Sequence, residues 1–490
     1  PEGRCGRIAW VPLEQDIIAG EAFGGLVPFW SVGGPTPGCP LPPGRHRHRT
    51  PQGVVAVVVR EDGERRRFAV CHDTMDESMA YTRAEKALQA DLGRIVDERI
   101  DRLASPALPA ALPAGLSALY RKAVCVLRTN LCSAEGRIRR TWVAPNRWPY
   151  RWMWTADAAF AAVAMRKLFP EAARASLQAA LESQDEDGRT PLYLRPDGGC
   201  PEIGHAPCLA WAAGVLCGPE NADFAAELYP RLRKYLLCSA ATRSFNRTGL
   251  YRWLHGDEVM DNSPRFDAGA QFGAVDLAGL LCIEYEHAAV LAGLAGEAKD
   301  AADWLRKRRR LAREVERRLW DESGGCYGDL RADGSLDARP TCAAFAPLAA
   351  GICSRSRAAR LVRLLKDPRR FGLALPVPSV AADHPAFCTD MWRGPAWPHV
   401  NWWIARGLDR YGRRREAEVL RRTTVEAAAR WYERTGCLYE FYDSRDRLAP
   451  AGLDRKCRLC YAAGCTNITD HARTAAALVL MCDELYGGLP

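Results

Sequence analysis

The stretch MWRGPAWPHVNWWIARGLDRYG, from Met391 to Gly412, decides how the rest of this sequence is interpreted. It opens with Trp392, Arg393 and a Gly-Pro pair, a combination that favours a loop. Apolar residues then recur at helical spacing from Trp397 onward, and Gly412 supplies a helix stop. A rigid aromatic face beside an arginine fork suits a flat polar ligand such as a sugar ring. For this stretch alone, a tryptophan-rich core helix is the competing interpretation.

Composition and charge exclude several classes of function. The 490 residues are 48% hydrophobic and 26% charged, as in a soluble globular protein with one large domain and an appendage, or with three small domains. The net charge is +9, but its densest cluster, Arg306 to Arg310, lies in an expected helix that also carries Glu314 and Glu316. A solvated helix face explains this cluster, so we expect no nucleic-acid partner. No apolar run approaches a membrane span, so we expect no membrane partner either.

The cysteine pattern indicates a reducing compartment. Nineteen cysteines are scattered over the chain. Several of them, such as Cys125 and Cys282, fall in apolar helical patterns, where cysteine behaves as a small core residue. This favours a cytoplasmic protein over a disulfide scaffold. The chain begins with Pro1, which is also compatible with removal of a preceding segment and with export.

Residues 1–105 differ from the remainder and are expected to form a small β-containing cap or remnant domain. Two β-branched runs, 54–59 and 68–70, flank an Asp62-Gly63 turn and predict a hairpin. A charged helix is expected over 83–102. The Pro-rich stretch 105–113 predicts a linker.

Residues 106–490 are expected to form an all-α catalytic domain, because every long periodic segment in them is helical. Links after the even-numbered helices have one to three residues, whereas links after the odd-numbered helices have about 18 to 31. Twelve antiparallel helices connected in this way predict an (α/α)6 barrel whose six long loops emerge on one rim. Functional groups concentrate on such loops. The expected helices are 112–132, 155–168, 170–185, 204–217, 221–240, 269–294, 296–320, 342–353, 356–367, 397–412, 414–435 and 467–486.

Three acids fall on this rim and are candidates for catalysis or binding. Asp261 lies beside apolar residues before the sixth helix, where partial burial would hold its proton, although its sequence also suits a helix cap. Glu440 follows the eleventh helix between two tyrosines, but an exposed loop glutamate is the commoner case. Asp157 begins the second helix and suits a cap or a sugar contact equally well.

From about Leu112 onward the chain resembles glycoside hydrolases of clan G. It is closest to family sixty-three and its bacterial relatives that hydrolyse mannosylglycerate or glucosylglycerate, and trehalases are more distant. The matching stretches are MWTADAAF (153–160), QDEDGRTP (184–191), HAPCLAWA (205–212), VMDNSPRFD (259–267), AVDL (274–277), LWDESGGCYGD (319–329), MWRGPAWPHVNW (391–402) and YEFYDS (439–444).

The resemblance implies an inverting α-glycosidase with Asp261 as general acid and Glu440 as general base. It also implies that Asp157, Trp392 and Arg393 line the sugar pocket. The expected substrate-binding set taken from these stretches is Trp154, Asp157, Gln184, Asp187, His205, Asn262, Trp392, Arg393, Trp397 and Tyr439.

Three departures from the family pattern alter the expected pocket. Ala156 stands where the family usually has tryptophan, 257–261 lacks the glycine that commonly precedes the acid, and 205–208 reads HAPC in place of Ser-Gln-Pro-Pro. The proposed catalytic pair persists, so the departures put the substrate in doubt rather than the chemistry.

One further motif, Cys457, Cys460 and Cys465 with His471 beyond, has zinc-ligand character. Its last gaps are irregular, and the resembling family needs no zinc there. We therefore expect unpaired thiols or a local disulfide, no metal and no cofactor.

The sequence thus predicts an inverting hydrolase of a small α-glucoside or α-mannoside, such as a glycosylglycerate or a disaccharide, with a small carbohydrate as its partner. Two alternatives remain: an amylo-1,6-glucosidase-like activity on oligosaccharides, and an inactive carbohydrate-binding protein. The oligomeric state stays open.

Overall fold

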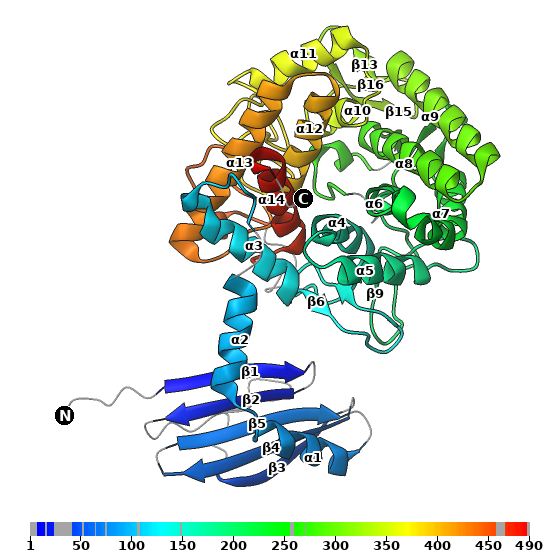
Figure 1. The fold of residues 1–490 in the computed structure, drawn as a ribbon. Helices are drawn as coiled ribbons and strands as arrows, with labels where there is room; N and C mark the ends of the chain where they lie inside the picture. The colour runs from blue at the N-terminus through cyan, green and yellow to red at the C-terminus, as the bar shows by residue number, and fades with distance from the viewer. Residues whose placement is uncertain are drawn as a thin grey trace. The chain divides into compact units, whose positions relative to one another are not determined.

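The computed structural model describes residues 7–14, 17–23, 42–50, 53–63, 65–73, 76–104, 108–147, 149–254, 259–269, 271–456 and 466–487. The chain divides into two units, Pro1–Ser105 and Pro106–Pro490, and each is described by itself (Figure 1).

The first unit contains a five-stranded antiparallel sheet with the strand order β1-β2-β5-β4-β3. The predicted hairpin is confirmed as β4 and β5, which turn at Gly63 with a positive φ of 59°. The other three strands lack a clear alternation of apolar residues and were not predicted. The strands are β1 Arg7–Glu14, β2 Ile17–Phe23, β3 Gly44–Thr50, β4 Gly53–Asp62 and β5 Arg65–Asp73.

The charged segment after the sheet forms two helices, α1 (Glu77–Ala87) and α2 (Leu92–Ala104), so the single helix expected over 83–102 is wrong. Side-chain caps explain the break. Asp76 accepts hydrogen bonds from the first turn of α1, and Asp91 accepts one from the Arg94 amide at 3.0 Å. The second cap starts a new helix where the periodicity alone suggests continuation.

The second unit holds twelve helices within the described residues, one at each of the twelve predicted places. They are α3 Ser117–Thr129, α4 Thr155–Met165, α5 Pro170–Glu182, α6 Leu209–Leu216, α7 Ala222–Thr242, α8 Val275–Leu294, α9 Ala298–Arg318, α10 Ala346–Ala349, α11 Arg355–Lys366, α12 Pro398–Arg410, α13 Arg414–Thr435 and α14 Ala472–Tyr486. Six of them contact one another in a closed cycle: α4, α6, α8, α10, α12, α14 and back to α4 (Figure 1). Five of the helices that alternate with them in sequence pack against this cycle: α3 on α14, α5 on α4, α7 and α9 on α8, and α13 on α12.

Several inner helices start later than predicted because the preceding residues are extended. Phe272 and Gly273 pair with Arg331 and Leu330, which delays α8 to Val275. The helix expected over 342–353 is a 3-10 turn, Cys342–Phe345, that leads into the four residues of α10. The short strands are β6 Leu131–Cys132, β7 Trp142–Val143, β8 Met153–Trp154, β9 Tyr193–Leu194, β10 Ser244–Phe245, β11 Leu250–Tyr251, β12 Phe272–Gly273, β13 Trp320–Asp321, β14 Cys326–Tyr327, β15 Asp329–Arg331 and β16 Leu336–Asp337.

Helix α8 combines length with an apolar sequence. Among the described residues it alone is long and apolar enough to cross a membrane, with a mean hydropathy of 1.4 over its apolar window. The expectation that no run approaches such a length therefore needs correction. Two-thirds of that window is buried within the protein, which is the environment of a core helix.

One buried acid on α8 fixes the start of its neighbour in the cycle. The Glu284 carboxylate accepts hydrogen bonds from the backbone amides of Ala210 at 3.1 Å and Trp211 at 2.7 Å, in the first turn of α6. It thereby caps a helix whose own N-cap residue, Cys208, makes no side-chain cap. Burial nevertheless raises the pKa of Glu284 from 4.5 to about 7.

This shift predicts a pH dependence of stability. Folding raises the pKa of Glu284, so its contribution to stability is complete below about pH 4.5 and is lost as the pH rises through 7. We expect the melting temperature of Glu284→Gln to fall less than that of the wild type when the pH rises from 5 to 8, as measured by thermal unfolding. Glu286→Gln is the matched control, because ion pairs outweigh burial at Glu286, lower its pKa and place its titration below this window. A pH slope for Glu284→Gln equal to that of the wild type would contradict the assignment.

Candidate active site

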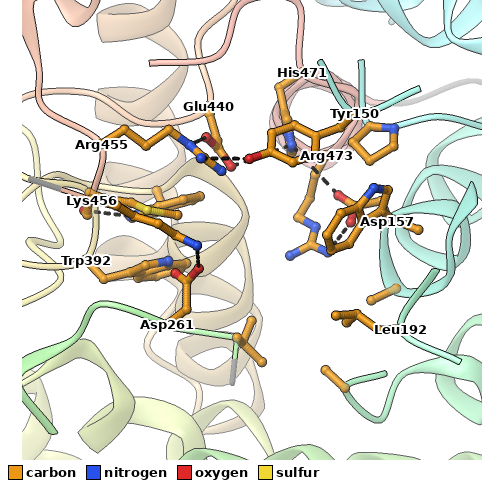
Figure 2. Close-up of a pocket in the computed structure, with 17 residues that line it drawn as sticks. Tyr150, Asp157, Leu192, Asp261, Trp392, Glu440, Arg455, Lys456, His471 and Arg473 are labelled. Carbon is orange, nitrogen blue, oxygen red and sulfur yellow. Dashed lines mark hydrogen bonds and ion pairs between the residues drawn. The ribbon is translucent and has the colours of Figure 1, made fainter. Parts of the chain in front are cut away.

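One pocket gathers side chains from the N-terminal ends of the inner helices and from the long loops (Figure 2). This is the rim that the link lengths predict. The described lining residues are Pro145, Tyr150, Trp154, Ala156, Asp157, Leu192, Ala206, Val259, Asp261, Met391, Trp392, Trp397, Glu440, Arg455, Lys456, His471 and Arg473.

Asp261 sits on a tight turn before α8 that the 391–393 segment holds in place. The Asn262 side-chain oxygen accepts a hydrogen bond from the Trp392 amide at 2.9 Å, and the Asn262 carbonyl accepts one from Arg393 Nε at 2.9 Å. Arg393 also pairs with Asp267. These contacts join the predicted acid to the aromatic stretch from Met391 to Gly412.

The Asp261 carboxyl has one paired oxygen and one unpaired oxygen. Its Oδ2 lies 2.5 Å from Lys456 Nζ, whereas its buried Oδ1 has no hydrogen-bond partner among the described residues. Burial disfavours the charge of Lys456, but the Asp261 carboxylate outweighs that effect and raises the lysine pKa. A ligand hydroxyl that donates a hydrogen bond to such a buried oxygen would satisfy an acceptor that otherwise has no partner.

Glu440 lies in a more enclosed, cationic environment. Its Oε2 is 3.0 Å from Arg455 Nε, and both side chains are less than 10% exposed. Arg455 also donates a hydrogen bond to the Tyr150 hydroxyl at 2.8 Å. Burial alone would raise the pKa of Glu440, but the charge of Arg455 outweighs it and holds that pKa below 4.5. Glu440 is therefore ionised at neutral pH, as a general base must be.

His471 and Arg473 connect Asp157 with Glu440. Arg473 Nη2 is 2.8 Å from Asp157 Oδ2. His471 Nε2 lies 3.9 Å from Asp157 Oδ1 and 3.8 Å from Glu440 Oε1. Burial lowers the pKa of His471, which leaves its imidazole neutral at neutral pH. In the view of Figure 2, Asp157, His471 and Arg473 face Asp261, Lys456 and Trp392 across the pocket.

Aromatic rings form two walls of the pocket. Trp392 and Trp397 stack with their ring centroids 3.8 Å apart and an interplanar angle of 5°. Trp154 packs on Tyr193 at 4.9 Å and on Tyr150 at 5.5 Å, and its buried Nε1 has no partner among the described residues. Such walls bind the apolar faces of sugar rings.

The backbone is strained beside the pocket. Met391 and Lys456 adopt positive φ angles of 41° and 58°, which residues with side chains rarely do. Gly394 is required by space, since a Cβ there would lie 2.0 Å from the Cys388 carbonyl oxygen. Strained residues cluster at functional sites when the surrounding structure fixes them.

Six of the expected site residues line the pocket: Trp154, Asp157, Asp261, Trp392, Trp397 and Glu440. Asn262 and Arg393 stand behind it and hold the Asp261 turn. Tyr439 is buried beside Tyr442, with ring centroids 6.2 Å apart.

Three residues of the expected substrate-binding set lie outside the described pocket lining and make local contacts. Gln184 donates a hydrogen bond to the Arg231 carbonyl at 2.9 Å. The Asp187 amide is bonded to the side chain of Asp185 in a surface turn. His205 is buried and stacks on Tyr235 at 5.1 Å. Each lies in a matching stretch, but none is among the described lining residues.

Five lining residues were not predicted from the sequence as part of the sugar site: Tyr150, Arg455, Lys456, His471 and Arg473. Position in the fold would have found two of them, because His471 and Arg473 begin the last inner helix and all inner helices begin at the rim. Arg455 and Lys456 carry no periodic signal. Cys457, Cys460 and Cys465 lie outside the described residues, and among those described no group of three His, Cys, Asp or Glu side chains is arranged to hold a metal.

Comparisons with known proteins agree with this chemistry. Residues 150–447, more than half of the chain, match the family described as "Mannosylglycerate hydrolase MGH1-like glycoside hydrolase domain". Mannosylglycerate hydrolase MGH1 of Selaginella moellendorffii is 24% identical over 384 residues, which cover 61% of this chain and 76% of that protein. An uncharacterized protein of Borreliella burgdorferi is 25% identical over 224 residues. The match covers 45% of this chain, and the chain spans only 45% of the length of that protein.

A solved structure shares the fold. GH63 mannosylglycerate hydrolase from Thermus thermophilus, in complex with glucose, gives a TM-score of 0.61 at 23% identity, covering 74% of this chain and 99% of that one. At this identity the likeness concerns the fold alone.

Proposed function

The chain belongs to the MGH1-like glycoside hydrolase family, and from that premise we propose that it hydrolyses a small α-mannoside or α-glucoside with inversion. A glycosylglycerate is the first candidate substrate, because relatives are named mannosylglycerate hydrolases. One observation carries the proposal: two carboxyl groups in different environments, Asp261 and Glu440, line one aromatic-walled pocket.

In this mechanism Glu440 is the general base and Asp261 the general acid. Glu440, held ionised by Arg455, takes a proton from the attacking water through Oε1, the oxygen that Arg455 does not bond. Asp261 gives its proton to the glycosidic oxygen as that bond breaks. Lys456 Nζ lies 2.5 Å from Asp261 Oδ2, so in this mechanism Lys456 moves off that oxygen before Asp261 acts as the acid.

The remaining lining residues bind the sugar. Asp157 and Arg473 offer charged hydrogen-bonding groups to its hydroxyls, while Trp154 and the Trp392–Trp397 stack face its ring. Asn262 and Arg393 hold the turn that carries Asp261.

We further propose that the second unit is an (α/α)6 barrel. The closed contact cycle of α4, α6, α8, α10, α12 and α14 supports it as the inner ring. The alternating outer helices and the position of the pocket at the N-terminal ends of the inner helices support it as well.

The catalytic assignment predicts that Asp261→Asn and Glu440→Gln each lose hydrolysis by about 10²–10⁴-fold or more, with an unchanged fold. The assay is release of free sugar from a panel of α-mannosides, α-glucosides and glycosylglycerates. Glu433→Gln, an exposed change of the same kind on α13, is the control. Near-normal turnover in either variant would remove that residue from its role. Wild-type binding without turnover of any panel member would favour the carbohydrate-binding alternative.

The stereochemistry is a separate prediction. A base that activates water leaves the product inverted, so the first sugar released from an α-glycoside should be the β-anomer. Proton NMR during the first minutes, before mutarotation, distinguishes the two anomers. First appearance of the α-anomer would make Glu440 a nucleophile and refute the proposed roles.

The Arg455–Glu440 pair predicts the acid limb of the pH profile. Because Arg455 holds the pKa of Glu440 below 4.5, kcat/KM should decline only below that pH. Arg455→Met removes the strongest interaction that opposes burial, so the acid limb should move to higher pH by about a unit or more. Arg430→Met, which breaks an exposed pair with Asp446, should leave the limb in place. An unmoved limb in Arg455→Met would contradict the role of this pair.

A further inference from the structure

A second cavity adjoins the sugar pocket and is enclosed by inner helices. Its walls are almost wholly apolar and include Phe160 of α4, Trp211 of α6, Leu280 and Ile283 of α8, and Trp403 of α12. We call this cavity the apolar chamber. It offers a sugar few hydrogen-bonding groups, because its Asp276 is bonded to Arg265 and Trp253, and burial keeps the pKa of His399 well below its usual value.

The chamber shares part of its lining with the sugar pocket. Ala156, Ala206, Val259, Trp392 and Arg473 line both cavities. Two of the five are alanines, and the methyl group of Ala156 leaves space beside Asp157, where a larger side chain would close the passage. A group attached to a bound sugar can therefore extend from one cavity into the other.

Apolar side chains of the chamber are incompletely packed. Leu280, Val400 and Trp403 are on inner helices, where close packing would bury them fully, yet each remains partly exposed. An apolar cavity of this kind stays dry and gains free energy when a hydrophobic group fills it.

The charges of the site decide which end of the substrate enters. Arg455, Lys456 and the catalytic carboxyls line the sugar pocket but not the chamber, so they mark the side of the scissile bond. The passage instead borders Asp157 and its partner Arg473, which the proposed function assigns to the sugar's hydroxyls.

We propose that the sugar cleaved by this enzyme carries a short alkyl or acyl chain on a hydroxyl remote from the anomeric carbon, and that the apolar chamber binds that chain. The inference rests on the proposed function and narrows its substrate class. It assigns the chamber to the glycone and not to the leaving group.

The test measures binding to Glu440→Gln, which prevents turnover, by isothermal titration calorimetry. One ligand series is methyl α-mannoside and methyl α-glucoside with 4-O- or 6-O-alkyl ethers of one to four carbons. The other series lengthens the aglycone from methyl to butyl. In either the 4-O or the 6-O ether series, the dissociation constant should fall roughly fourfold per methylene until the chamber is full. In the aglycone series, the dissociation constant should not change with chain length.

Filling the chamber should remove this gain. Leu280→Phe, added to Glu440→Gln, places a larger ring in the chamber away from the shared residues, so the affinity for long ethers should drop to that for the methyl glycoside. The methyl glycoside itself should bind as before. Leu305→Phe, on the exposed face of α9, is the matched control. Should Leu280→Phe melt early, Val400→Phe fills the chamber from α12 and serves instead.

The outcomes separate the two proposals. Methyl glycosides that bind, with ethers that gain nothing, overturn the chamber and leave the proposed function standing. A gain confined to the aglycone series overturns the orientation proposed for the chain. If neither methyl glycoside binds and the wild type hydrolyses no α-glycoside of the panel, both proposals fail together.

Discussion

The candidate site depends on one buried ion cluster, in which Arg265 lies between Asp276 and Asp329. Its guanidinium donates two hydrogen bonds to each carboxylate at 2.7–2.9 Å, and all three side chains are buried. Arg265 follows Asp261 by four residues, Asp276 begins α8, and Asp329 begins β15, so the cluster fixes the acid's loop to the inner helices. Removing one partner of such a cluster typically costs about 3–5 kcal/mol, because the other charges stay buried. The position of Asp261 is thus set by interactions outside the pocket.

The same principle, a buried acid matched with an arginine, produces a different result at Glu440. In the Arg265 cluster every carboxylate oxygen is bonded, which makes the cluster structural. At Glu440, Arg455 bonds only Oε2, and His471 stays 3.8 Å from Oε1. An acid that is held ionised but keeps one oxygen for water is suited to proton transfer. Pairing therefore distinguishes the structural acids from the acids available for chemistry.

Local and global information explain how much could be predicted from the sequence. Helical periodicity and link lengths are local, and they placed all twelve helices and the rim, including Asp261, Glu440 and Trp392. Helix starts were less accurate, because short strand pairings such as 272–273 with 330–331 override the periodicity. The resemblance also assigned to the sugar Gln184 and His205, whose partners lie elsewhere in the fold. The Arg455–Tyr150 contact joins residues 305 apart in sequence, and no single stretch contains a signal for such a pair.

Lys456 occupies one oxygen of Asp261, the residue that the proposed mechanism makes the general acid. The two charged groups lie 2.5 Å apart, and the backbone of Lys456 has a positive φ. If Asp261 is the acid, as we propose, a substrate that approaches Oδ2 has to displace Lys456 or give it a new partner. Part of the binding free energy is then used to rearrange the pair, and only a ligand that reaches Lys456 supplies it. In the proposed mechanism, substrate binding and acid catalysis therefore share this one contact.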